Sequence, residues 1–167
     1  FATAIAAKTI FQKKTGEGDE AFLAGLMLNI GKVALAQFSV DEGCQDLKKS
    51  IIQNMSTQNS TIVELERRVW STDHYAIGAK MLEHWNFPLG LIETLDEYGT
   101  KLKEPDEFTQ ALSLSEHIAS MLFNNNFSID DLKRVKSQAL NLLEMSETEF
   151  DSLFECILAE WMNYAKL

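Results

Sequence analysis

The sequence is poor in residues that interrupt or crosslink a chain. Its 167 residues include two prolines, eight glycines and two cysteines. Long helices are therefore favoured, because proline and glycine are the residues that a helix interior tolerates least. Cys44 and Cys156 lie far apart and neither belongs to a CxxC pair. They indicate small core residues in a reducing compartment and not a disulfide framework.

Long apolar segments are also scarce. No apolar run approaches the roughly 18 residues that a membrane-spanning helix needs. Near the N-terminus Lys8, Lys13 and Lys14 follow the apolar residues, whereas in a signal peptide the basic residues come first. The sequence therefore predicts a cytoplasmic protein without a membrane partner.

Basic residues are outnumbered by acidic ones. The chain has 25 Asp and Glu against 15 Lys and Arg, a formal net charge of −10. A domain this negative repels a phosphate backbone, so we expect no nucleic-acid partner. The hydrophobic content of 46% is sufficient for a globular core. The length predicts a single domain over residues 1–167.

Apolar residues recur every three to four positions along nearly the whole chain, which is typical of helices. Residues 20–38 predict one long helix, and Ser71 or Thr72 is expected to cap the helix that ends near Trp85. Further N-caps are predicted at Ser39, Thr61, Ser128 and Ser146. No segment favours a strand, so the predicted fold class is all-α, a multi-helical bundle of about eight or nine helices.

The common motifs of enzyme active sites are missing. GxGxxG, GxxxxGK[ST], GxSxG and HExxH do not occur, so dinucleotide-binding, P-loop, serine-hydrolase and zinc-protease chemistry lack support. The chain has three histidines, His74, His84 and His117, and this scarcity limits any histidine-rich metal site.

Two segments, in contrast, form long motifs. Residues 21–32 are AFLAGLMLNIGK, and residues 73–88 are DHYAIGAKMLEHWNFP. In this order and separation they resemble the HDOD domain, a bacterial signalling branch of the HD superfamily of metal phosphohydrolases. Its patterns are AFLAGLLHDIGK and DHxxxGxxLLxxWxxP. The resemblance covers residues 1–123, and it implies an HD-like helical bundle that lacks an N-terminal helical part in this chain.

The first motif departs from the superfamily at the residues that hold metal. In catalytic HD proteins an adjacent His-Asp pair binds divalent metals, which activate water against a phosphoester. The resemblance places this pair at Leu28 and Asn29. A leucine cannot ligate a metal, and a neutral amide is a much poorer ligand than a carboxylate.

The remaining ligand positions are also mostly lost. By the same resemblance, the paired histidines of catalytic relatives fall near Tyr98 and Gly99, and a later carboxylate falls near Glu116. Asp73 and His74 alone keep their identities. We therefore expect no catalytic residues, no metal ligands and no cofactor.

What remains is a vestigial pocket, for which the predicted residues are Leu28, Asn29, Lys32, Asp73 and His74. Structural roles compete with ligand binding at each polar position. His74 can be a hydrogen-bonded structural histidine, Asn29 can satisfy buried backbone groups, and Lys32 can be a solvated helix residue.

Other residues of the two motifs are expected to serve packing. Gly25, Gly31 and Gly78 lie outside any glycine-rich loop, so they favour close helix packing over phosphate binding. Trp85 and Phe87 are expected to be core anchors at a helix end and not a ligand cage.

The resemblance implies a non-catalytic bacterial signal-transduction module that acts by protein–protein interaction. Its partners would be other signalling proteins or fused signalling domains, and a small ligand could bind the vestigial pocket. The alternative is a metal-dependent HD phosphohydrolase that acts on a nucleotide or cyclic dinucleotide. A third hypothesis is a helical scaffold without a ligand. The sequence specifies no oligomeric state.

Overall fold

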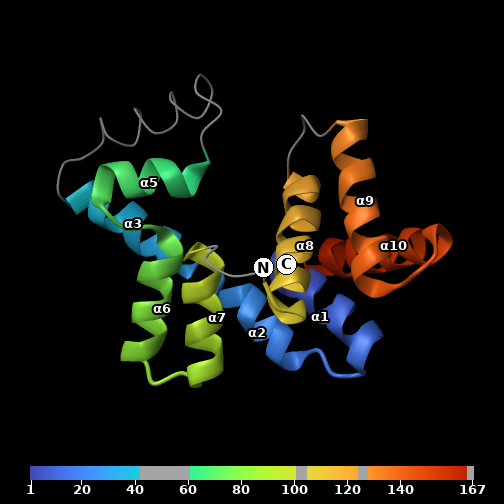
Figure 1. Cartoon of the computed structure of the whole chain (residues 1–167), viewed down its shortest axis with the longest axis horizontal. Helices are drawn as coiled ribbons and strands as arrows, with labels where there is room; N and C mark the ends of the chain where they lie inside the picture. The colour runs from blue at the N-terminus through green and yellow to red at the C-terminus, as the bar shows by residue number, and fades with distance from the viewer. Residues whose placement is uncertain (42–60, 101–104, 124–127, 165–167) are drawn as a thin grey trace. The chain divides into compact units, whose positions relative to one another are not determined.

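The computed structural model consists of helices and connecting segments, and it describes residues 1–41, 61–100, 105–123 and 128–164 (Figure 1). Its helices are α1 (Ala2–Thr15), α2 (Asp19–Met27), α3 (Ile30–Asp41), α5 (Ile62–Trp70), α6 (His74–His84), α7 (Leu89–Thr100), α8 (Glu107–Phe123), α9 (Ile129–Leu143) and α10 (Glu147–Tyr164). No strand occurs in these ranges, so the predicted all-α fold class is confirmed.

The chain forms two compact units. The first comprises Phe1–Leu26 and Pro105–Leu167, and the second comprises Met27–Glu104. Helices α1, α8, α9 and α10 therefore belong to the first unit, with most of α2, and α3, α5, α6 and α7 belong to the second. That one domain spans residues 1–167 stays a prediction.

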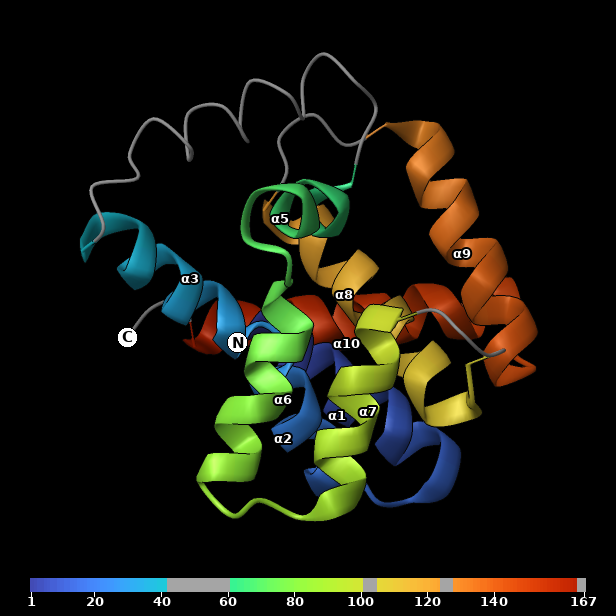
Figure 2. The same ribbon diagram turned by 60° about the vertical axis from the view of Figure 1, so that its left-hand side comes forward.

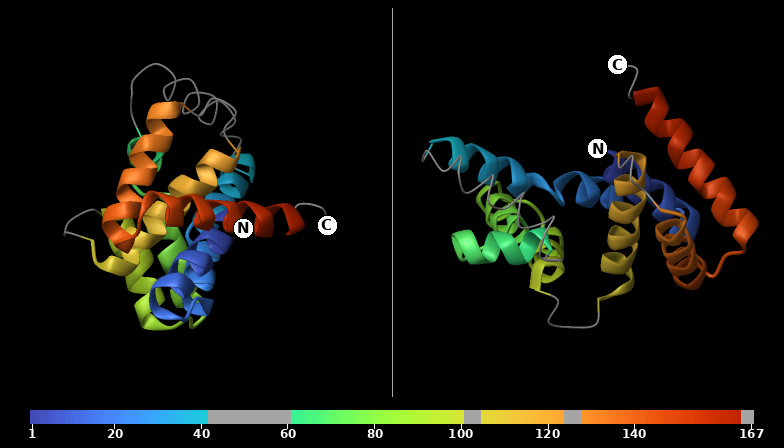
Figure 3. Two further views of the ribbon diagram at one scale, coloured as in Figure 1. Left: turned by 90° about the vertical axis from the view of Figure 1, so that its right-hand side faces the viewer. Right: turned by 90° about the horizontal axis from the view of Figure 1, so that it is seen from above.

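Helix α1 occupies the centre of the first unit. Residues 2–7 are all buried, and four of the six are alanine, whose short side chain lets neighbouring helices come close. A Cβ added to Gly25 of α2 would lie 2.8 Å from the Cα of Ala4. Helices α8 and α10 also pack against α1 (Figure 2, Figure 3). The core of this unit includes Ile5, Ile10, Leu114, Ile118, Phe150, Leu153 and Ile157.

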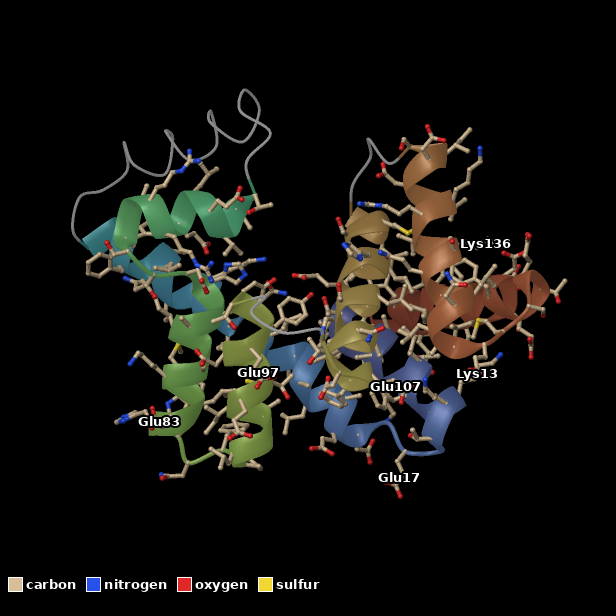
Figure 4. All side chains as sticks on the ribbon, viewed as in Figure 1. Lys13, Glu17, Glu83, Glu97, Glu107 and Lys136 are labelled. Atoms are coloured by element: carbon tan, nitrogen blue, oxygen red, sulfur yellow. The ribbon has the colours of Figure 1, made fainter. Side chains whose placement is uncertain are left out.

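A lysine links two helices at the surface of the first unit. The ammonium group of Lys136 on α9 lies 2.9 Å from Asp151 and 3.1 Å from Glu147, both on α10 (Figure 4). Both carboxylates are largely exposed, so water screens each pair and neither contributes much to stability. The packing of the apolar core therefore decides how α9 and α10 associate.

His117 of α8 is a partly buried titratable group of the first unit. Its Nδ1 is buried without a hydrogen-bond partner among the residues that the structure describes. Burial lowers the pKa of the imidazole below its ordinary value, and the positive charge of Arg134 lowers it further. The carboxylate of Glu116 opposes these effects by a smaller amount. Protonation of His117 therefore favours the unfolded chain.

The second unit depends on two close helix contacts made by α6. A Cβ added to Gly31 of α3 would lie 1.9 Å from the carbonyl oxygen of His74 and 2.8 Å from the nitrogen of Gly78. A Cβ on Gly78 would lie 3.3 Å from Leu95 of α7. These contacts, with that of Gly25 in the first unit, confirm the predicted packing role of the three glycines.

Three helix starts follow the predicted capping pattern. The hydroxyl of Thr61 accepts from the N–H of Glu64 (3.3 Å), and the Glu64 carboxylate accepts from the N–H of Thr61 (2.9 Å). Ser146 and Glu149 make the same reciprocal pair, at 3.3 and 2.8 Å. Ser128 caps α9 in this way as well. Because capping is decided by residues three positions apart, it could be predicted locally.

Two predicted helix boundaries are wrong in the region of residues 20–41. The expected single helix is interrupted, because α2 ends at Met27, Leu28 and Asn29 form a turn, and α3 begins at Ile30. Leu28 is fully buried, so the apolar pattern continues through the turn and conceals it. Helix α3 extends through Ser39, which therefore starts no new helix. The helix expected over residues 42–60 lies outside the described residues.

Two predictions at the ends of α6 are also corrected. Asp73 caps the helix, whereas Ser71 adopts the left-handed conformation (φ 56°) that ends α5. Trp85 is 47% exposed and Phe87 is partly buried, so the tryptophan is no core anchor. Trp85 lies just before the α6–α7 turn, where the left-handed Asn86 (φ 57°) directs the chain back toward α7. A side chain at such a tip has few neighbours to cover it.

One segment has the length and apolar character of a membrane span. Within the part of the chain described, Asp19–Phe38 has a mean hydropathy of 1.5, and 33% of the window is buried inside the protein. Charged and polar residues such as Asn29 and Lys32 divide its apolar residues, so the segment contains no long uninterrupted apolar run. The turn at residues 28 and 29 interrupts the helix in this segment, so length and composition alone are weak evidence for a span.

Replacing Gly31 tests the contact between α3 and α6. Gly31→Ala places a methyl group against the backbone of His74, which cannot move away as a flexible side chain would, and we expect a loss of about 1–3 kcal/mol in the free energy of unfolding. Gly90→Ala in α7 is the matched control, since nothing lies within 4 Å of an added Cβ. It should be neutral or stabilising by up to about 1 kcal/mol. Urea denaturation measures both, and equal effects would contradict the close contact.

The buried imidazole of His117 predicts a pH dependence of stability. Because its pKa is lower in the folded protein, its contribution is present above the ordinary pKa of 6.5 and is lost as the pH falls below that value. His117→Gln cannot titrate, so its free energy of unfolding should vary less than that of the unmodified chain between pH 7.5 and pH 5.5. Urea denaturation at both pH values measures this change. An equal change in the free energy of unfolding for the two proteins would disprove the assignment.

Candidate functional site

The second motif begins with a buried carboxylate at the start of α6. Asp73 has extended backbone angles (φ −133°, ψ 171°), as expected of an N-cap residue. Its Oδ1 accepts hydrogen bonds from the N–H groups of Tyr75 (2.9 Å) and Ala76 (3.0 Å). The residue is 2% exposed. One oxygen of Asp73 is therefore occupied by the first turn of its own helix.

The other oxygen of Asp73 is held by an arginine. The Nε and Nη2 atoms of Arg67 each lie 2.6 Å from Oδ2 of Asp73. Nη2 also donates to the carbonyl oxygen of Gly99, at 2.6 Å. One guanidinium thus joins α5, the N-cap of α6 and the C-terminal end of α7. Charge-assisted hydrogen bonds of this kind are stronger than neutral ones.

His74 is held by a second acidic residue. Oε2 of Glu66 accepts from the backbone N–H of His74 (3.0 Å) and lies 2.5 Å from its Nδ1. The His74 side chain is completely buried, and that of Glu66 is 6% exposed. The His74 ring lies beside the Tyr75 ring, with 4.0 Å between their centroids. The ring centroids of Tyr75 and of Tyr98 on α7 lie 4.7 Å apart. His74 is therefore a hydrogen-bonded, buried histidine, as expected of a structural role.

Glu66 and Arg67 were not identified from the sequence. Glu66 nevertheless lies on the apolar face of α5, four residues after Ile62, next to Leu65 and three residues before Val69. A carboxylate in the middle of an apolar stripe is the signal that could have revealed it, because such a residue is buried only with a partner. Arg67 gave no such signal, since its side chain is 44% exposed.

The first motif contacts the start of α6 through Gly31. Leu28 and Asn29 form the α2–α3 turn, and Leu28 is fully buried. The backbone N–H of Lys32 donates to the carbonyl oxygen of Asn29 (3.1 Å), and the Lys32 side chain is partly buried. Gly31, between them in the sequence, lies against His74. The structure thus brings the segment of residues 28–32 to the segment that contains Asp73 and His74.

The residues near which the resemblance places the other ligands have different roles in this structure. Tyr98 packs on Tyr75, and the carbonyl of Gly99 accepts from Arg67. A Cβ on Gly99 would lie 3.0 Å from that of Tyr75 and 3.3 Å from Oδ1 of Asp73, so a histidine there would displace its neighbours. Glu116 lies on α8, in the other unit.

The donor atoms do not fit the metal centre of catalytic HD proteins. Leu28 offers no ligand atom and both oxygens of Asp73 already accept hydrogen bonds, which leaves Nε2 of His74, among the described residues, as the one unengaged ligand atom of the Asp-His pair. In the ranges that the structure describes, no three His, Cys, Asp or Glu side chains gather in a way that could hold a metal ion. That Leu28, Asn29, Lys32, Asp73 and His74 form a pocket stays a prediction.

The ion pair of Asp73 can be tested without removing its helix cap. Asp73→Asn keeps an oxygen for the N–H groups of Tyr75 and Ala76 but directs an amide group at Arg67. We expect it to lower the free energy of unfolding by about 1–3 kcal/mol, a range that allows for the partial exposure of Arg67. The control is Asp106→Asn, since Asp106 is an exposed N-cap that accepts from Thr109 (2.7 Å). Equal losses in urea denaturation would show that the ion pair contributes nothing.

Comparison with known proteins agrees with the motifs. The HDOD domain family matches residues 1–99. No curated protein sequence is similar enough to count as a relative. A solved response regulator, MmoQ from Methylococcus capsulatus strain Bath, shares 25% identity with a TM-score of 0.66, over 92% of this chain and 58% of its own.

A second solved structure, a Shewanella amazonensis SB2B protein with the provisional name of phosphohydrolase, shares 19% identity with a TM-score of 0.68. The match covers 95% of this chain and 56% of that one, and at this identity it shows the fold alone. This chain therefore spans less than two thirds of either solved protein. The family match covers more than half of the chain and includes both motifs, so the chain belongs to the HDOD domain family.

Proposed function

We propose that this chain is a non-catalytic signal-transduction module that acts by protein–protein interaction in the bacterial cytoplasm. The observation that carries the proposal concerns the position that the family resemblance assigns to the histidine of the metal-binding pair. A buried leucine occupies it, and the Asp-His pair of the second motif is engaged by Arg67 and Glu66. Hydrolysis by metal-activated water needs several free ligands in one place.

The kind of partner is inferred from the family and from one relative. The response regulator MmoQ, which matches most of this chain, belongs by its name to a signalling pathway. Other signalling proteins, or signalling domains on the same polypeptide, are therefore the proposed partners. The formal charge of −10 disfavours nucleic acid. A nucleotide or cyclic dinucleotide bound near Asp73 and His74 could bias the module between two conformations.

The absence of catalysis can be tested against the alternative of a metal-dependent phosphohydrolase. The purified chain is subjected to elemental analysis and assayed with bis-p-nitrophenyl phosphate and a cyclic dinucleotide in the presence of Mn²⁺ or Fe²⁺. We expect no stoichiometric metal and no turnover above that of the His74→Ala variant. Bound iron, manganese or zinc together with turnover that this variant abolishes would establish the hydrolase instead.

The interaction itself needs a separate measurement. Tagged chain is used to isolate partners from bacterial extract, and each partner is then purified and mixed with metal-free protein. We expect direct binding to a protein with a receiver, kinase-like or cyclic-dinucleotide domain. Calorimetry with nucleotides and cyclic dinucleotides tests the ligand, and partner binding without any nucleotide binding would leave the interaction role and remove the ligand role. Failure of every purified partner to bind would contradict the proposal.

A further inference from the structure

Two buried nitrogens of the second unit are complementary in their hydrogen-bonding character. Nε1 of Trp70 and Nε2 of His74 are both buried, and neither has a hydrogen-bond partner among the described residues. The indole N–H is a donor only. In a neutral His74 the ring proton is on Nδ1, because the Glu66 carboxylate lies 2.5 Å from that atom, and Nε2 is then an acceptor.

The two groups belong to helices that Glu66 joins. Trp70 follows Glu66 by four residues, so both side chains are on the same face of α5. Glu66 binds the backbone N–H and the ring of His74, which shows that this face of α5 is turned toward the start of α6. Trp70 is also the last residue of α5, and three residues separate it from His74.

A hydroxyl-like group can satisfy both nitrogens at once. Buried polar groups almost always have a partner, and an internal water molecule commonly supplies it when protein groups do not. A cation suits this place poorly, since the indole would direct its N–H dipole at the positive charge. We propose that Trp70 and His74 bind one internal water molecule, which accepts from Nε1 of Trp70 and donates to Nε2 of His74.

This site goes beyond the proposed function, and it explains the two unpartnered nitrogens by a neutral ligand. It also assigns a tautomer to His74, with the proton on Nδ1 and the lone pair on Nε2. The water would link the end of α5 to the first residue of α6, beside the bond that Glu66 already makes there.

Nuclear magnetic resonance on the whole ¹⁵N-labelled chain tests the proposal. A long-range ¹H–¹⁵N spectrum gives the tautomer of His74, and water-selective cross-relaxation detects water held near the Trp70 indole N–H. We expect the Nδ1–H tautomer, a hydrogen-bonded Nε2 signal, and a cross-peak with the sign of a long-lived water. An Nε2–H tautomer, an Nε2 signal of an unbonded acceptor, or no such cross-peak would overturn the proposal.

Matched variants identify the donor. Trp70→Phe removes the indole N–H and should shift the Nε2 resonance of His74, whereas Trp85→Phe at the 47% exposed tryptophan should leave it unchanged. Should Trp70→Phe fail to fold, the spectra of the unmodified chain decide the question alone. Titration with Zn²⁺ distinguishes the occupants, since broadening or displacement of the Nε2 signal at stoichiometric metal would show a cation site and contradict the water.

Discussion

The carboxylate of Asp73 is the group on which the second unit depends. It is almost completely buried, and a buried charge is tolerated only when its hydrogen bonds are satisfied. Two backbone N–H groups of α6 and the guanidinium of Arg67 provide these bonds, and Arg67 reaches on to the carbonyl of Gly99. The ends of α5, α6 and α7 are therefore fixed by one charge and its donors.

The second acidic residue extends this arrangement in a different way. Glu66 binds both the backbone and the ring of His74, so α5 holds the first residue of α6 in position and orientation. The close approach of Gly31 to the His74 carbonyl then brings α3 to the same place. The two residues that the resemblance assigns to metal binding in catalytic HD proteins thus coincide here with the junction of several helices. This coincidence gives Asp73 and His74 a structural role that requires no metal.

Local signals explain which parts of the fold could be predicted. The caps at Thr61, Ser128 and Ser146 depend on residues three positions away, so the sequence contains all the information. The turn at residues 28 and 29 was concealed because Leu28 is buried and continues the apolar pattern. The exposure of Trp85 was missed for a related reason. Hydrophobicity predicts that a side chain prefers burial, but only the surrounding helices decide whether it is covered.

The sequence by itself determined the helical class and indicated the family, and through that resemblance it placed a leucine and a neutral amide, Leu28 and Asn29, at the metal-binding pair. The helical class follows from residue spacing, and the other two conclusions follow from the resemblance of the two motifs, which needs no coordinates. Only the tertiary structure decided that Glu66 is the partner of His74, that Arg67 spans from Asp73 to Gly99, and that Gly31 lies against α6. Each of these contacts joins residues from different helices, and the packing of those helices is set by many weak contacts at once.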